Sequence, residues 1–341
     1  MNNVIVALRG NKMGLRLIIV GVGILVTFGG CGHKTKQDQD NDDLSVSKSK
    51  MVVDESLQPI VDEELYVFKA LYPNLHPEVA YAPENNAVNM LLNYDVQFAL
   101  LSRDLNAQER SVLAQRRITP IVSRFALDAV TLIVNKASKD TTIKVSEIKR
   151  MLNSDANTSK STDNTNSALN HIKSPSADNK TVRNIVFDNP NSGLVRYLKD
   201  FAGNADFKQK NIYSLKSNKE VIKYVSEHPD AIGITGFGWL NDPDKDYAAA
   251  VGNVKIVSVM DDVTKNARKQ YFTPSQTTLA LKQYPLVRNL YVLDCTGRRG
   301  LAYQFAAFIL SDRGQRIILK SGLLPDSIPN RVINIRKKIL Q

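Results

Sequence analysis

The sequence is poor in the residues that most often carry metal or covalent chemistry. Of its 341 residues only two are cysteine and four are histidine. The histidines, at positions 33, 76, 171 and 228, are well separated, and none falls in a metal-binding spacing such as HExxH. We therefore expect no metal site and no cofactor.

Catalytic motifs are also missing. The chain has no G-x-S-x-G elbow, no P-loop and no G-x-G-x-x-G. The glycine-rich "GITGFG" at 233–238 is better explained by close backbone packing in a strand and turn. We expect that the protein is not an enzyme. An enzyme on a two-lobed scaffold would need convergent acid–base or nucleophilic groups, which the sequence does not offer.

The charge is unbalanced, with a formal net charge of +11. Such a balance raises the question of a nucleic-acid partner. The basic residues are scattered, however, with no run of five and no alternation with aromatic residues. This distribution is typical of a solvated basic surface, so we expect no nucleic-acid partner.

The N-terminus has the pattern of a lipoprotein signal peptide. Basic residues precede the short apolar run "LIIVGVGILVTFGG", which ends directly before Cys31. "FGGC" is similar to a bacterial lipobox, which implies cleavage after residues 1–30 and a lipid on Cys31. An uncleaved anchor is the alternative, although the run is short for a membrane span. Residues 31–50 are polar and predict a flexible tether.

These features predict a place in the cell envelope, periplasm-facing or on the surface, with membrane contact through the lipid anchor only. If Cys31 carries lipid, Cys295 has no cysteine left to pair with. We expect Cys295 to be a small buried hydrophobic residue.

From Met51 the apolar pattern alternates between strand-like and helix-like segments, which indicates an open α/β sheet. The almost wholly apolar "VQFALLS" is typical of a parallel strand buried on both faces. Residues 153–184 interrupt the alternation, because Ser, Thr, Asn, Asp and Lys dominate there; we expect a long surface loop or a disordered insertion. The region 300–325 predicts one long helix or two. The predicted strands are 51–56, 78–83, 96–102, 126–136, 184–189 and 284–295, and the predicted helices include 57–73, 84–95, 106–117 and 193–201.

Small polar residues stand at three predicted strand ends: "DES" at 54–56, "SRD" at 102–104 and "NPNSG" at 189–193. Ligands of open α/β sheets bind at the carboxyl ends of strands, and a helix start suits an anion. Each segment is also compatible with an ordinary helix N-cap. Taken together, the three leave an anion site and simple capping as equal alternatives.

The order of the motifs resembles the phosphate-binding lipoproteins of phosphate ABC transporters. The segments that carry the resemblance are "LLSRDLNAQE", "DAVTLIVNK", "NSGLVRYL", "DAIGITGFG" and "SGLLPDSIP". The resemblance implies an α/β, two-lobed periplasmic-binding-protein fold of type II, with mixed or parallel sheets and helices on both faces. It also implies a ligand between the lobes. Lobe 1 would comprise 51–130 and 278–341, and lobe 2 would comprise 131–277.

The resemblance also implies a set of ligand contacts, which this chain matches in part. Leu194 stands where the family has a threonine, Asp188 where it has an arginine, and Arg103 follows Ser102 in place of an aspartate. The candidate ligand-binding residues are Ser56, Leu57, Ser102, Arg103, Asp104, Asn191, Ser192, Gly193 and Leu194.

The departures suggest a rearranged site. Arg103 would supply the cation that is lost at Asp188, and could hold two ligand oxygens at once. The acceptor for the proton of hydrogen phosphate would then be Asp104 or Glu84; otherwise the site no longer prefers phosphate. For Arg196 we favour a solvent-facing position over one in the cleft.

The sequence thus predicts an anchored, monomeric solute-binding protein that captures an inorganic oxyanion, phosphate first, and delivers it to ABC permease subunits. Lobe closure on the anion would be the mechanism. The alternative is a degenerate binding-protein fold that acts as an envelope sensor or interaction module without transport.

Overall fold

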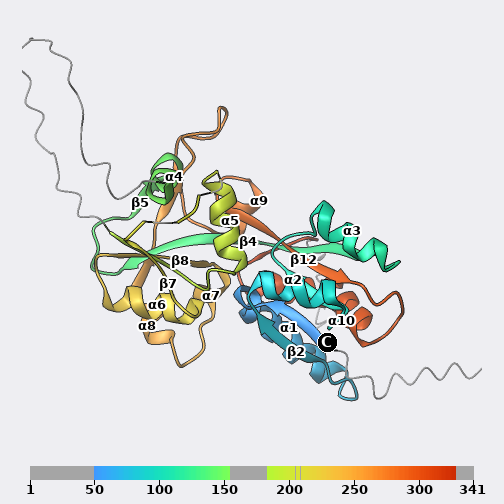
Figure 1. Ribbon diagram of the computed structural model, residues 1–341. Helices are drawn as coiled ribbons and strands as arrows, with labels where there is room; N and C mark the ends of the chain where they lie inside the picture. Colours follow the sequence, from blue (N-terminus) through green and yellow to red (C-terminus); the bar gives the residue numbers. More distant parts are fainter. Residues whose placement is uncertain (1–49, 154–182, 204, 208, 328–341) are drawn as a thin grey trace, which may run out of the picture. The chain divides into compact units, whose positions relative to one another are not determined.

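The computed structural model describes residues 50–153, 183–203, 205–207 and 209–327 (Figure 1). The predicted signal peptide, the lipid site at Cys31 and nearly all of the predicted tether lie outside the described residues, as does 154–182 of the predicted insertion. The last tether residue, Lys50, begins the first strand.

The described chain alternates between strands and helices, as the sequence predicted. Up to the insertion, the elements are β1 (Lys50–Asp54), the 3-10 turn η1 (Glu55–Leu57), α1 (Gln58–Leu71), β2 (Glu78–Ala82), α2 (Glu84–Asn93), β3 (Phe98–Leu101), α3 (Ala107–Gln115), β4 (Ile121–Asn135), β5 (Thr142–Lys144) and α4 (Val145–Asn153). After it come β6 (Asn184–Phe187), α5 (Gly193–Phe201), β7 (Ile212–Ser214), α6 (Asn218–Glu227), β8 (Ala231–Gly236), α7 (Gly238–Asn241), α8 (Ala248–Gly252), β9 (Val254–Ile256), β10 (Ser258–Met260), β11 (Tyr271–Phe272), α9 (Gln276–Ala280), β12 (Val287–Asp294), α10 (Leu301–Leu310), α11 (Asp312–Lys320) and β13 (Leu324–Pro325).

The main sheet has the strand order β2-β1-β3-β12-β4-β8-β6-β7 and mixes parallel and antiparallel pairs. β1 pairs in parallel with β2 and β3, whereas β12 runs antiparallel to both β3 and β4. The four residues of β3 are all buried, as expected for "VQFALLS", but only one of its two neighbours is parallel. A small second sheet contains β11, β10 and β5.

β4 is longer than the strand predicted at 126–136, and it takes part in both halves of the main sheet. Residues 121–129 pair with β12, and residues 130–134 pair with β8. The core divides at the same place: one set of buried clusters draws on β1–β3, α1, α2, β12, α10 and α11, and the other on β5–β10 with α4–α6. We keep the names lobe 1 and lobe 2 for the predicted division; its boundaries stay a prediction.

Local sequence explains where several helices begin. Asn106 and Glu109 form a reciprocal capping box at the start of α3, and Ser192 Oγ accepts from the N–H of Val195 at the start of α5. Ser311 caps the end of α10 and the start of α11, so the helical region 300–325 is two helices.

The predictions for Cys295 and for the glycine-rich segment are confirmed. Cys295 is a free, buried cysteine, and burial raises the pKa of its thiol to about 11. The glycine-rich segment at 233–238 begins inside β8, where a Cβ at Gly233 would lie 2.6 Å from a Val225 methyl carbon. Trp239 is buried. In the described part of the chain, none of the helices combines the length and the apolar character that a membrane crossing requires.

Candidate functional site

Four strand ends come together near the first turn of α5. They are the turn after β1, the start of α2 after β2, the Ser102–Arg103 turn after β3, and the loop from β6 to α5. Gly193 is where they meet: a Cβ added there would lie 2.2 Å from Ser102 Oγ, 2.4 Å from Asp54 Oδ2 and 2.7 Å from Glu84 Oε2. Only a residue without a side chain permits this approach. A backbone hydrogen bond of 3.1 Å from Asn85 N–H to the Asn191 carbonyl joins α2 to the same loop.

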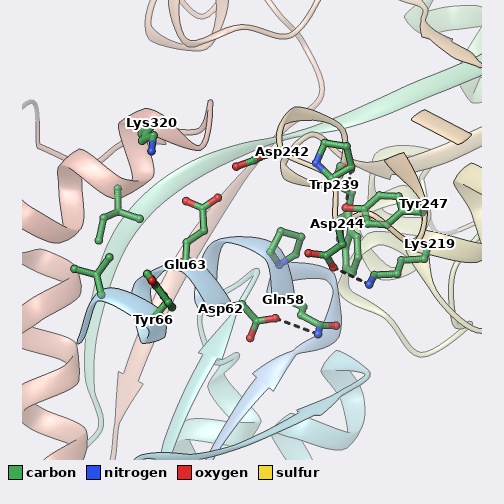
Figure 2. A pocket seen from close by; sticks show the side chains of 14 residues that line it. Gln58, Asp62, Glu63, Tyr66, Lys219, Trp239, Asp242, Asp244, Tyr247 and Lys320 are labelled. Carbon is green, nitrogen blue, oxygen red and sulfur yellow. Dashed lines mark hydrogen bonds and ion pairs between the residues drawn. The ribbon is translucent and has the colours of Figure 1, made fainter. Parts of the chain in front are cut away.

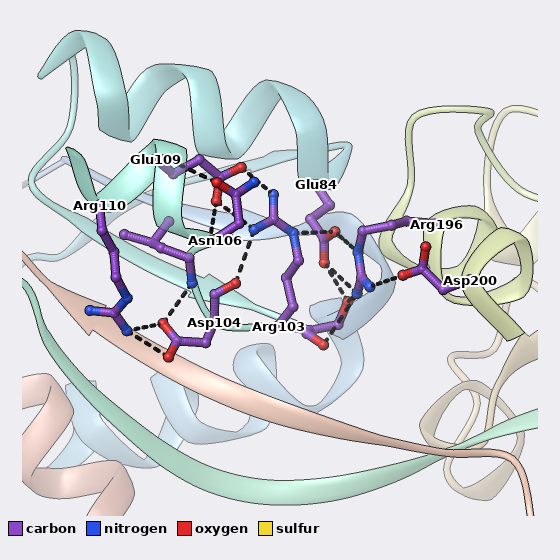
Figure 3. Close-up of polar contacts among 10 residues, drawn as sticks. Glu84, Arg103, Asp104, Asn106, Glu109, Arg110, Arg196 and Asp200 are labelled. Carbon is purple, nitrogen blue, oxygen red and sulfur yellow. Dashed lines mark hydrogen bonds and ion pairs between the residues drawn. The ribbon is translucent and has the colours of Figure 1, made fainter. Parts of the chain in front are cut away.

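Glu84 lies at the centre of the first polar network (Figure 3). Its fully buried carboxylate accepts from Ser102 Oγ at 2.5 Å, from Arg103 Nε at 3.2 Å and from Arg196 Nε. Burial alone would raise the pKa of Glu84. The charge of Arg196, its hydrogen bond, and the contacts of Ser102 and Arg103 outweigh burial and hold the pKa below its usual value. The carboxylate is therefore charged at neutral pH.

The two arginines of this network each have a second carboxylate partner. Arg103 forms a two-pronged ion pair with Glu109, at 2.6 and 2.7 Å, and Arg196 Nη1 lies 3.2 Å from Asp200. Arg196 thus faces the site, and the solvent-facing interpretation is wrong. The sequence signal was its spacing: Arg196 lies one turn after the cap Ser192, so both fall on one helix face.

A second network surrounds Asp188, which is fully buried. Ser192 Oγ donates to its Oδ1 at 2.5 Å and Asn218 Nδ2 to its Oδ2 at 2.9 Å, while Thr235 Oγ1 donates to Asn218. Burial, with the nearby charge of Asp54, raises the pKa of Asp188 to about 7 against the lowering by Ser192. Asp188 therefore approaches neutrality at physiological pH and orders the loop before α5.

A third network links β12, β4 and the turn η1. Buried Arg288 donates to Asp128 Oδ2 through Nε at 2.9 Å and Nη2 at 2.7 Å, and to Ser56 Oγ through Nη1 at 2.9 Å. Trp239 Nε1 donates to the Ser56 carbonyl at 2.9 Å. Gly236 makes room for the pair, because a Cβ there would lie 2.9 Å from Arg288 Nη2.

Asp54 lies between these networks and has one oxygen to spare. Its Oδ1 accepts from the Ser56 N–H at 3.1 Å, whereas its buried Oδ2 has no hydrogen-bond partner among the described residues. Burial, followed by the charge of Glu84, raises the pKa of Asp54 to about 6 in spite of Arg288. An unpaired buried oxygen beside a helix start is an acceptor that a ligand proton could use.

The structure separates the predicted site residues into three kinds. Ser102, Arg103, Ser192 and Gly193 lie at the meeting point described above, and Ser56 Oγ accepts from Arg288 nearby. The side chains of Leu57 and Leu194 are buried in hydrophobic cores.

Asp104 and Asn191 belong to the third kind, whose side chains take no part in the three networks described above. Asp104 accepts two hydrogen bonds of 2.6 Å from Arg110 Nη2 and one from the Leu105 N–H. Asn191 is exposed and contributes its backbone. Sequence reasoning missed Arg288, Asp128 and Asn218. For the first two the signal was present, namely a charged residue in a predominantly apolar strand.

A separate cavity of about 480 Å³ lies beside α1 and the loop after α7 (Figure 2). Acidic side chains, among them Asp62, Glu63 and Asp242, gather on its wall, and Lys219 there is paired with Asp244 at 2.8 Å. This wall is unsuited to an anion. Among the described residues, no group of three or more His, Cys, Asp or Glu side chains is arranged to hold a metal ion.

Comparison with known proteins places this geometry in a family. The model of the PBP superfamily domain matches residues 38–313. The chain belongs to the PBP superfamily. Within it, the chain is 26% identical over 301 residues to the phosphate-binding protein PstS of Borreliella burgdorferi, covering 84% of this chain and 92% of that protein.

Two solved structures have a similar fold. One is a substrate-binding protein assigned to a phosphate ABC transporter of Clostridium perfringens, solved with bound phosphate (TM-score 0.61, 16% identity, 82% of this chain and 100% of the other). Another is an ABC-type phosphate transport receptor of Vibrio cholerae (TM-score 0.54, 16% identity, 81% and 99%). These likenesses confirm the predicted two-lobed, type II α/β fold.

Proposed function

We propose that this protein is the substrate-binding component of an ABC importer, and that it binds an inorganic oxyanion, phosphate first, beside the first turn of α5. One observation carries the proposal. A serine hydroxyl and two guanidinium groups, from Ser102, Arg103 and Arg196, converge on the two oxygens of a single carboxylate. That carboxylate, of Glu84, occupies the position that two oxygens of a bound anion would take.

The donor set suits a compact, multiply charged oxyanion. Guanidinium groups can bind two oxygens of one anion, and charge-assisted hydrogen bonds are about twice as strong as neutral ones. The N–H groups of the first turn of α5 add further donors and a partial positive charge, and Gly193 allows oxygen atoms to approach that turn closely because it has no side chain. A neutral sugar would leave the arginines without an anionic partner.

Asp54 gives the proposed site a preference for a protonated oxyanion. Its unpartnered Oδ2 would accept the proton of hydrogen phosphate. Sulfate carries no proton at neutral pH and would place an oxygen against this oxygen, which leaves the buried acceptor unpaired. Asp54 replaces Asp104 as our candidate acceptor, because Asp104 is taken by Arg110.

The family relationship and the N-terminal sequence support the cellular setting that we propose. The curated relative is named a phosphate-binding protein and the two solved structures are assigned to phosphate ABC transport. We infer ABC permease subunits as partners, a lipid on Cys31 as the anchor, and an envelope protein that acts as a monomer and performs no covalent chemistry.

Isothermal titration calorimetry tests the proposal. The full chain, purified in detergent and stripped of bound anion by partial unfolding and dialysis, is titrated with phosphate, arsenate, sulfate and a neutral sugar. We expect phosphate and arsenate to bind and sulfate to bind at least tenfold more weakly, about 1.4 kcal/mol. Equal binding of sulfate and phosphate would refute the role of Asp54. No binding of any anion would favour the interaction module over transport.

A further inference from the structure

The donors that would hold an oxyanion are already occupied by a side chain of the protein itself. Glu84 receives Ser102 Oγ on Oε2, Arg103 Nε on Oε1 and Arg196 Nε on Oε1. A Cβ at Gly193 would lie 2.7 Å from Oε2, so the carboxylate lies against the first turn of α5. A ligand oxygen and Glu84 cannot share these donors at the same time.

The charges of the two arginines are already balanced by carboxylates of the protein. Glu84 is charged and fully buried, a state that is stable only with paired cations and hydrogen bonds. Arg103 is further neutralised by Glu109, whose side chain is 13% exposed, whereas Asp200 is 60% exposed and adds only a weak, water-screened contact to Arg196. Two guanidinium groups thus face three carboxylates, so an arriving anion meets no free positive charge at this position.

The same contact also joins two elements from different lobes of the predicted division. Glu84 begins α2, with only Pro83 between it and β2, whereas Arg196 lies on α5. The backbone bond from Asn85 N–H to the Asn191 carbonyl runs alongside. Asn85 lines two cavities of about 400 and 310 Å³; the first is also lined by Arg103 and the second by Arg196, so solvent reaches both arginine side chains.

We propose that Glu84 is an internal competitor of the oxyanion, and thereby the residue that sets the affinity of the site. Without ligand it holds the anion donors and ties α2 to α5. Ligand capture requires the Glu84 carboxylate to leave these donors. The inference rests on the proposed function, because the competition concerns the same site.

The test is calorimetry on Glu84→Gln, which keeps the shape and removes the charge. We expect its affinity for phosphate and sulfate to rise together, by roughly tenfold or more, since coupling between competing groups is commonly 5- to 150-fold. Glu84→Ser, which removes the carboxylate altogether, should behave likewise and covers the case in which the first variant folds poorly. The matched control is Asp200→Asn, which takes a negative charge from the same Arg196 at a side chain that is 60% exposed. It should change affinity less than threefold.

A ligand-independent readout separates this inference from the proposed function. In anion-free protein, hydrogen exchange at the Asn85 amide should quicken in Glu84→Gln and stay unchanged in Asp200→Asn. Faster exchange at Asn85 in Glu84→Gln, with no anion binding in any variant, would refute the proposed function. It would still support the role of Glu84 in holding α2 against α5. Unchanged phosphate affinity in Glu84→Gln and Glu84→Ser would refute the proposal that Glu84 competes with the oxyanion. A loss of phosphate affinity with unchanged sulfate affinity would also refute it, and would show that Glu84 accepts the proton of the ligand.

Discussion

Replacement of Arg288 by methionine should destabilise the protein far more than the removal of a surface arginine. The side chain of Arg288 is 1% exposed and that of Asp128 is 4% exposed, so neither charge has access to water. The substitution removes three hydrogen bonds and leaves the Asp128 carboxylate with the N–H groups of Ala129, at 2.8 Å, and Phe237, at 3.2 Å. Breaking a buried pair from one side typically costs about 3–5 kcal/mol, because a buried charge is left without its partner.

Urea unfolding measures this cost. Far-UV circular dichroism follows the whole fold, and fluorescence of Trp239, the single tryptophan, follows the region beside the pair. Coincident transitions are required before a single free energy of unfolding is calculated. The matched control is Arg124→Met, because Arg124 pairs with Asp326 at 2.5 Å while the two side chains are 44% and 34% exposed. Exposed pairs contribute about 0–1 kcal/mol.

The double variant Arg288→Met with Asp128→Asn decides the mechanism. If the cost arises from an unpaired buried charge, neutralising Asp128 should return a large part of it, giving a coupling energy of about 1–3 kcal/mol. A loss below about 1 kcal/mol in Arg288→Met, or strictly additive losses in the double variant, would refute the reasoning.

Three further predictions concern the site and its surroundings. Because burial raises the pKa of Asp188 from 3.8 to about 7, the folded state binds the proton of this carboxyl more tightly than the unfolded state does. The resulting stabilisation of the folded state is fully present below about pH 4 and is lost as the pH rises to about 7. This stabilisation is at most about 4 kcal/mol. The melting temperature of Asp188→Asn should therefore depend less on pH than that of the wild type, and an equal dependence would contradict the raised pKa of Asp188. Gly193→Ala should weaken oxyanion binding at least tenfold, because its Cβ would meet Ser102 Oγ at 2.2 Å; calorimetry with unchanged affinity would show that α5 approaches less closely. Trp239→Phe should cost about 1–3 kcal/mol in urea unfolding, since it leaves the Ser56 carbonyl without its donor, and a neutral result would mean that another donor replaces it.

The sequence predicted the elements well where an apolar period coincided with clear start and stop residues. The run from β1 to α3 follows this rule, with Pro59 at the start of α1 and Asn106 at the start of α3. The short strands β9 to β11 carry no such period: they are two or three residues long and depend on their partners in the fold.

The site was predictable at the level of strand ends but not at the level of partners. Ser102, Ser192 and Gly193 were found because small polar residues at helix starts are a local signal. Which cation each carboxylate meets is set by contacts between distant segments, such as Glu84 with Arg196, 112 positions apart. Helical spacing showed that Arg196 shares a face with Ser192, but nothing local indicated that α2 lies opposite that face.

β4 places a limit on how the protein can open. Its 15 residues run without a break from the pairs with β12 to the pairs with β8, so no flexible linker stands at that point between the two halves of the sheet. Any hinge motion must therefore bend or twist a hydrogen-bonded ribbon. The register shift between Leu290 and Tyr291, opposite β4, is the one irregularity recorded in that pairing and the natural place for such a bend. A hinge made from a continuous strand resists large swings, which favours small rotations that return elastically to the same arrangement.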